Sequence, residues 1–142
     1  MKADPKCLNF LSRISSASQL LSLFDLLPDV SFFIKDRKGR FITLNRGGCE
    51  YCGVKSSHEA SGRTDRDFFP PGRAAEYMAD DSAVMTSGKP ILNRLEAAPE
   101  REGSPRLVVT NKIPLRDSRG RVIGVAGFSR RVEQVRCAPG AM

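Results

Sequence analysis

The chain has 142 residues, of which 40% are hydrophobic and 27% are charged, and its formal net charge is +7. This length suits one domain that buries roughly two-thirds of the surface of its unfolded chain. The composition is that of an ordinary globular protein, and no apolar run approaches the length of about 18 residues that a transmembrane helix needs. The basic residues are scattered with no long basic run, so we interpret the charge as a solvated basic surface and expect no direct contact with nucleic acid.

The four cysteines lie at positions 7, 49, 52 and 137. Their spacing does not suggest a disulfide framework, which favours a reducing cytoplasm. Cys49 and Cys52 form a C-x-x-C pair, but zinc needs two more ligands, and only the distant Cys7, Cys137 and His58 remain. We therefore expect no metal site. A redox pair and two small apolar residues on the inward face of a short helix both remain possible for Cys49 and Cys52.

Residues 5–27 are predicted to form one amphipathic helix that ends before Pro28, because apolar residues recur at steps of three and four. Leu11, Ile14 and Leu21 lie on this stripe and are the candidate dimer contacts. Packing of the helix on its own domain would produce the same pattern.

Residues 31–45, SFFIKDRKGRFITLN, are predicted to form a β-hairpin. Two apolar runs flank Asp36–Gly39, in which Asp favours the first turn position and Gly the last. Residues 115–123, LRDSRGRVI, repeat the Asp-x-x-Gly-Arg pattern. A second, similar hairpin is therefore expected.

Between the hairpins the sequence predicts helices. Asn45 can cap a short helix that contains Gly47 and Gly48, and Gly53 can end it. The best helix of this part is 73–87, with Glu76, Asp80 and Asp81 placed on its solvent side. Three strands follow, over 90–96, 106–115 and 121–131.

Residues 20–133 resemble a bacterial PAS sensory domain. The resemblance rests on five blocks in the family's order: LPD, KDRKGRF, GRTDRDFFP, SGKPILNRLE and TNKIPLRDSRGRVIGVAGFSR. It implies an α+β fold, in which helices cover one face of a five-stranded antiparallel sheet, preceded here by an N-terminal amphipathic helix. We accordingly expect an N-terminal helix in 1–27, a PAS domain in 28–133 and a disordered tail in 134–142.

PAS domains are generally not enzymes. The resemblance implies a signal-transduction module that binds a small molecule or a partner and regulates an output, such as a histidine kinase, a nucleotide cyclase or a transcription regulator, outside this chain. The alternative is an interaction and dimerisation module whose pocket is filled by its own side chains. A homodimer formed partly by the N-terminal helix is expected in the first case.

Strand alternation and the resemblance together suggest a ligand pocket. Side chains two residues apart share a face of a strand, and the positions matching the family's pocket lie on the inner face. Gly47 and Gly48 stand where bulkier residues are common, and they either enlarge the pocket or loosen its helical wall. The candidate pocket residues are Phe33, Leu44, Cys52, Phe69, Met78, Met85, Val108, Thr110, Lys112, Val125, Gly127 and Ser129.

Lys112 is the most informative of these residues. A lysine on the inner face of a central strand needs a partner, because an isolated buried ammonium is too costly. We expect a structural ion pair with Glu96 or Asp67, and the alternative is direct recognition of a ligand.

The resemblance also bears on cofactors and coupling. The helix 73–87, where the haem ligand of PAS domains usually sits, contains no His, and GRTDRDFF lacks the Cys that forms a flavin adduct in light sensors. Both features argue against these cofactors. Arg131 replaces an Asp that the family usually carries after the last strand, which puts the usual coupling to an output domain in doubt.

Overall fold

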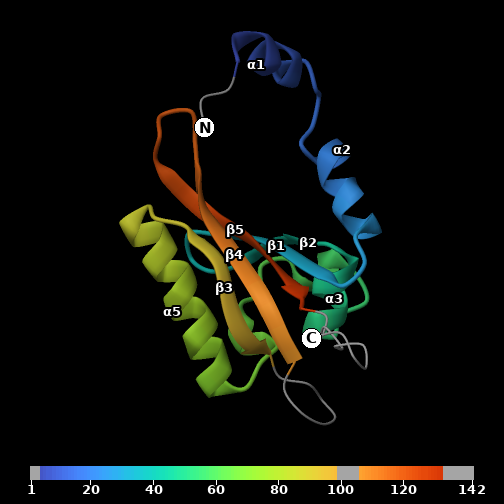
Figure 1. Ribbon diagram of the computed structural model, residues 1–142, viewed down its shortest axis with the longest axis vertical. Helices are drawn as coiled ribbons and strands as arrows, with labels where there is room; N and C mark the ends of the chain where they lie inside the picture. Colours follow the sequence, from blue (N-terminus) through green and yellow to red (C-terminus); the bar gives the residue numbers. More distant parts are fainter. Residues whose placement is uncertain (1–3, 99–105, 133–142) are drawn as a thin grey trace, which may run out of the picture.

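The computed structural model describes residues 4–98 and 106–132. They form one five-stranded antiparallel sheet in the order β2-β1-β5-β4-β3, against which α3, α4 and α5 pack (Figure 1). The α+β class and the sheet agree with the prediction, and the predicted tail 134–142 lies outside the described residues. The elements are α1 (Pro5–Ser12), α2 (Ser18–Leu21), η1 (Ser22–Leu26), β1 (Val30–Asp36), β2 (Phe41–Leu44), α3 (Arg46–Cys52), α4 (Ser57–Ala60), η2 (Asp65–Asp67), α5 (Pro71–Ser87), β3 (Ile91–Ala98), β4 (Arg106–Arg116) and β5 (Val122–Arg131).

Both predicted hairpins are present, one joining β1 to β2 and the other joining β4 to β5. In each turn the glycine N–H donates to the carbonyl of the turn's aspartate at 3.0 Å, from Gly39 to Asp36 and from Gly120 to Asp117. Both glycines have φ of 79°. The left-handed backbone at this position explains why the sequence repeats a glycine there.

Asn45 fixes the start of α3, as its position in the sequence predicted. Its side chain accepts hydrogen bonds from the N–H of Gly48 at 2.8 Å and of Phe32 at 2.9 Å, and donates to the carbonyls of Phe24 and Val30 at 2.9 Å each. The amide is 3% exposed, and these four bonds use its whole hydrogen-bonding capacity. One side chain therefore ties η1, β1 and α3 together.

The glycines in α3 allow the helix to approach the backbone of β1. A Cβ atom on Gly47 would lie 2.1 Å from the carbonyl oxygen of Val30, and one on Gly48 would lie 2.8 Å from the carbonyl oxygen of Phe32. No side chain fits at such distances. The structure thus assigns the glycine pair to close helix–strand packing.

The single helix predicted over 5–27 is wrong, because α1 ends at Ser12 and only short helical segments follow. The Oγ of Ser16 accepts a hydrogen bond from the N–H of Ser18 at 3.1 Å and also pairs with the Ser18 hydroxyl. Such local serine bonds compete with a continuing helix. In α1 no residue is buried, whereas in η1 the ring of Phe24 stacks on Phe32 at 4.4 Å.

The hydrophobic core consists of two clusters that share Phe33. One consists of Phe41, Leu44, Cys49 and Ala60, which come from β2, α3 and α4. The other consists of Val84, Met85 and Val125, where α5 packs on the sheet. Among the described residues, none of the helices combines the length and the hydropathy that crossing a membrane would require.

Candidate functional site

Four charged side chains meet in the interior, between the two apolar clusters. Lys35 comes from β1, Lys112 from β4, Asp65 from η2 and Asp81 from α5. Their exposures are 3%, 6%, 2% and 2%, although charged residues are rarely buried so completely. We call these four residues the charged cluster.

The charged cluster is joined by three short ion pairs. The Nζ of Lys35 lies 2.6 Å from Oδ2 of Asp65 and 2.6 Å from Oδ2 of Asp81. The Nζ of Lys112 lies 2.7 Å from Oδ1 of Asp81. Asp81 therefore bridges the two lysines, and the two positive and two negative charges balance.

This balance decides which protonation states the interior favours. Burial by itself lowers the pKa of Lys35, but the charges and hydrogen bonds of Asp81 and Asp65 outweigh it and hold that pKa above its ordinary value. Burial raises the pKa of Asp65, and the attraction of Lys35 offsets this only in part. Lys35 is thus held as the ammonium ion, and the pKa of Asp65 lies above the ordinary value of an aspartate.

Aromatic rings line the charged cluster. The ring centroid of Phe33 lies 4.7 Å from Nζ of Lys35 and 5.5 Å from Nζ of Lys112, within the range of cation–π attraction. Phe41 and Tyr77 stand in the same relation to Lys35 and Lys112, at 4.8 and 5.9 Å. The inner wall of the site is therefore aromatic as well as charged.

Gly127 makes room for Phe33 on the sheet. The two residues are direct partners across β1 and β5, and Lys112 faces Gly127 from the other side. A Cβ atom on Gly127 would lie 2.9 Å from the ring of Phe33 and 2.6 Å from the carbonyl oxygen of Asn111. Any larger residue would push the ring away from the sheet.

Hydrogen-bonding capacity is left over inside the charged cluster. A lysine ammonium has three N–H donors, yet within the described part of the chain Lys112 has one hydrogen-bond acceptor, Asp81. In the same residues only Oδ2 of the Asp65 carboxylate is hydrogen-bonded. The cluster can therefore still bind an oxygen acceptor at Lys112 and a donor at Asp65.

The predicted partners of Lys112 are wrong. Glu96 accepts instead from the hydroxyl of Thr110 at 2.9 Å, which pairs in turn with Ser129 at 2.9 Å. Asp67 accepts from the backbone N–H of Thr64 and so caps η2. Lys112 is buried and paired, as the sequence indicated, but with Asp81.

The other candidate pocket residues fall into three groups. Those beside the charged cluster are Phe33, Val125, Gly127 and Met85, while Thr110 and Ser129 extend the same inner face of the sheet toward Glu96. Val108 lies on the same strand face as Thr110 and Lys112 and pairs with Glu96 and Arg131. Leu44 belongs to the apolar cluster formed by β2, α3 and α4, and Cys52 packs against that cluster. Two residues lie elsewhere. Phe69 packs between Tyr51 and Tyr77, and Met78 lies next to Gly39 of the first turn.

The sequence analysis did not predict three members of the charged cluster, Lys35, Asp65 and Asp81. Lys35 follows Phe33 by two residues, so the strand alternation that singled out Lys112 also applies to it. Asp81 was predicted on the solvent side of its helix, and its 2% exposure contradicts this. Its spacing of four from Tyr77 and Met85 is the signal that places it on the inner stripe of α5.

The thiols of α3 are shielded rather than activated. Cys49 is buried among apolar side chains and Cys52 packs against that cluster. Burial raises the pKa of Cys52 to about 12 and raises that of Cys49 as well. A raised pKa suppresses the reactive thiolate at neutral pH, so this geometry suits core packing better than redox exchange.

The comparisons with known proteins agree with this architecture. The family model described as "PAS fold" matches residues 24–136. A relative is the methanogenesis regulatory histidine kinase FilI of Methanothrix harundinacea (strain 6Ac), which is 33% identical over 133 residues, or 89% of this chain and 15% of FilI.

Solved structures of VqmA are also similar. A structure of the Vibrio cholerae VqmA dimer in the absence of target DNA has a TM-score of 0.69 at 28% identity, covering 83% of this chain and 52% of VqmA. A structure of VqmA bound to DPO gives 0.69 and 28%, with coverage of 83% and 58%. This chain thus spans about half of the VqmA chains and a small part of FilI. From the family match and the five-stranded sheet together, the chain belongs to the PAS fold family.

Proposed function

We propose that this domain senses a small apolar or weakly acidic molecule, which binds in the interior through an oxygen acceptor at Lys112. The observation that carries the proposal is an ammonium that is 6% exposed and has one hydrogen-bond acceptor among the described residues. Buried donors are nearly always satisfied, so a ligand oxygen is the natural additional partner. As a PAS domain of this kind, the chain acts as a regulatory and not a catalytic module.

The surroundings of Lys112 define the chemistry of the ligand. A carbonyl or carboxylate oxygen would accept from the ammonium, and a donor group could reach the free oxygen of Asp65. The rings of Phe33 and Tyr77 favour a flat or apolar body. A small apolar or weakly acidic molecule with one oxygen acceptor fits these groups.

A groove of about 470 Å³ lies between α5 and β3, and Tyr77 lines it together with Arg73, Asp80, Arg94 and Glu96. The ring centroid of Tyr77 also lies 5.9 Å from Nζ of Lys112, so we infer that the ligand enters from this groove past Tyr77. Entry would require the Tyr77 side chain to turn aside.

The relatives support a regulatory output. FilI is a regulatory histidine kinase, and VqmA has both DPO and target DNA as partners. We infer that this domain passes its signal to a kinase or transcription regulator, as a homodimer in the cytoplasm. The exposed apolar residues of α1 and the dimeric state of VqmA support the dimer, and the three free cysteines among the described residues support the compartment.

A second candidate function is a ligand-free interaction module. It is favoured by the pairing of all four members of the charged cluster with one another, which leaves no net charge to compensate. In this case the cluster is a structural element that fills the pocket.

Titration of the purified domain with DPO, followed by native mass spectrometry with a metabolite mixture, separates the two functions. Lys112→Met removes the ammonium but leaves Asp81 bonded to Lys35, so the fold should survive. Lys89→Met, at an exposed lysine, is the matched control. Sensing predicts a bound small molecule that Lys112→Met loses and Lys89→Met retains. Binding unchanged in Lys112→Met, or no bound molecule in any arm, would overturn the sensing proposal.

A further inference from the structure

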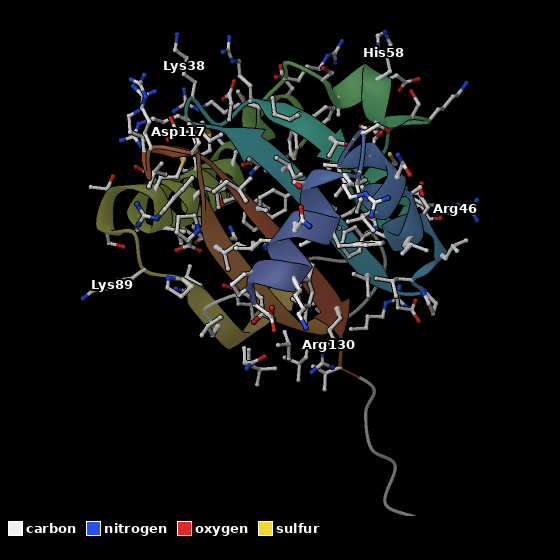
Figure 2. The ribbon with its side chains drawn as sticks, turned by 90° about the horizontal axis from the view of Figure 1, so that it is seen from above. Lys38, Arg46, His58, Lys89, Asp117 and Arg130 are labelled. Carbon is white, nitrogen blue, oxygen red and sulfur yellow. The ribbon has the colours of Figure 1, made fainter. Side chains whose placement is uncertain are left out.

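The two hairpin turns, Asp36–Arg40 and Asp117–Arg121, are built alike and lie side by side. In each, the aspartate accepts hydrogen bonds from the backbone N–H two and four residues later and from the arginine Nε at the end of the turn. The guanidinium of Arg37 donates to the carbonyl of Val122 at 3.0 Å and so joins the two hairpins. Figure 2 shows Lys38 and Asp117 on the same side of the molecule.

This end of the molecule gathers basic residues that are far apart in the sequence. Arg116, at the end of β4, belongs to this group because its Nη1 donates to the carbonyl of Gly120 in the second turn at 2.9 Å. The only carboxylates in the two turns, Asp36 and Asp117, each accept three hydrogen bonds within their own turn. We call the following residues the twin-turn surface: Arg37, Lys38, Arg40, Arg116, Arg119 and Arg121.

The positive charge of the twin-turn surface is largely uncompensated. Its six basic residues against two carboxylates give a local formal charge of +4, compared with +7 for the whole chain. Lys38 and Arg119 hold the same position in the two turns and are exposed, and within the described residues neither side chain has a hydrogen bond or an ion pair. Both are therefore available to an anionic partner.

A depression of about 550 Å³ opens beside the turns. Arg37 and Arg121 line it together with the apolar side chains of Met85, Val122 and Ile123, and with Asp117, which is already bound to its own turn. Ile123 is 52% exposed, so its side chain can contact a partner. The depression thus combines guanidinium groups with an apolar lining.

This combination identifies the kind of partner. Guanidinium groups bind carboxylates in a two-pronged geometry, and the apolar lining rewards an apolar side chain placed between acidic ones. None of the six residues that line the depression is aromatic, so the stacking used to bind single-stranded nucleic acid has no platform there. We propose that the twin-turn surface docks an acidic segment of another protein, with an apolar side chain of that segment in the depression.

The test is fluorescence anisotropy with a labelled peptide of Asp, Glu and Leu at physiological salt. Lys38→Glu/Arg119→Glu reverses the two free charges, Arg37→Ser gives the first turn the residue that Ser118 supplies in the second, and Ile123→Thr makes the depression polar. Arg46→Glu/Arg130→Glu is the control with the same change in net charge, on residues away from the turns (Figure 2). Circular dichroism checks that each variant is folded.

We expect peptide affinity to fall about tenfold or more in the double turn variant and severalfold in Arg37→Ser and Ile123→Thr, with little change in the control. An equal loss in the control would show that net charge alone attracts the peptide and would overturn the proposal. So would equal binding of a peptide in which Ser replaces Leu. Tighter binding of a DNA duplex or of phosphatidylserine vesicles, lost in the same variants, would assign the surface to those partners instead.

Discussion

Of the two buried lysines, Lys35 makes more ion pairs, since it contacts both carboxylates of the charged cluster. Within the described residues, Asp81 is the one carboxylate that pairs with Lys112. Removing Lys35 would leave Asp65 buried with no hydrogen-bonded cation among the described residues. Burying a charge without its partner costs far more than burying neither.

Lys35→Met should therefore destabilise the domain by about 3–5 kcal/mol. Lys35→Met/Asp65→Asn should lose clearly less, because it removes one positive and one negative charge and leaves the pair of Lys112 and Asp81. Urea unfolding followed by circular dichroism measures both free energies. A double variant less stable than Lys35→Met would contradict the view that the stranded carboxylate is the main cost.

Because the pKa of Lys35 is raised in the folded state, the free energy of unfolding should fall at alkaline pH. The folded state holds this proton more tightly than the unfolded chain, whose lysines titrate near 10.5, so the stabilising contribution is complete below that pH. It is lost as the pH rises through the folded pKa. The free energy of unfolding should fall more steeply above pH 10.5 in the wild type and in Lys38→Met than in Lys35→Met. If the free energy of unfolding fell with pH at the same slope in all three proteins, the Lys35 ammonium would not be the cause of this loss of stability.

Residue patterns predicted one member of the charged cluster, Lys112, but not its partner. Alternation along β4 placed Lys112 inward because a strand has a period of two, and the same rule reaches Lys35. The partner of Lys112 depends on how α5 is rotated over the sheet. That rotation follows from the packing of Val84 and Met85. The sequence separation between Lys112 and Glu96 or Asp67 carries no information about it.

Among the elements, α3 depends on having no side chain where it meets β1. Gly47 and Gly72 are both helical glycines, but a Cβ atom on Gly47 would collide with the backbone of Val30, whereas one on Gly72 would have nothing within 4 Å. The same substitution should therefore have opposite effects at the two positions.

Gly47→Ala should destabilise the domain by about 1–3 kcal/mol, because α3 must move away from β1. Gly72→Ala should be neutral or stabilise it by up to about 1 kcal/mol, since alanine favours the helix. Thermal unfolding of the two variants provides the comparison. If Gly47→Ala unfolded at the wild-type temperature, the close approach of α3 would not matter to stability.

The elements were predicted best where turn residues mark their ends. Asp36, Gly39, Asn45 and Gly53 each sit where backbone geometry demands them, so both hairpins and α3 followed from sequence. The length of the N-terminal helix was overestimated because apolar residues recur at helical spacing on both sides of Ser15–Ser18. The helix instead ends at Ser12, and Ser16 and Ser18 then bond to each other, a local arrangement that hydrophobic periodicity does not report.

At the scale of the whole molecule, α1 lies apart from the sheet (Figure 1). None of its residues is buried, and Leu8, Phe10 and Leu11 are 54%, 64% and 45% exposed. An isolated helix of 8 residues is barely stable in water, so such an element gains most from a partner. Of the predicted contacts Leu11, Ile14 and Leu21, only Leu11 belongs to α1.

Deleting residues 1–22 should convert the proposed homodimer to a monomer in light scattering, with little change in unfolding temperature. The stability should persist because the deletion removes no buried residue among those described. Leu8→Ser/Phe10→Ser in the full chain should weaken the dimer in the same direction. A truncated protein that stays dimeric would move the interface to another surface.

One helix connects the interior to the basic end of the molecule. Asp81, which bridges the two buried lysines, and Met85, which lines the depression beside the turns, stand four residues apart on the same side of α5. Lys35 near the end of β1 and Arg37 in the turn that follows are likewise close in sequence, with only Asp36 between the buried ammonium and the guanidinium that lines the depression. A shift of α5 that lengthened the bonds of Asp81 would also reshape the depression, so the chain has a mechanical path from its core to its surface that does not pass through either terminus.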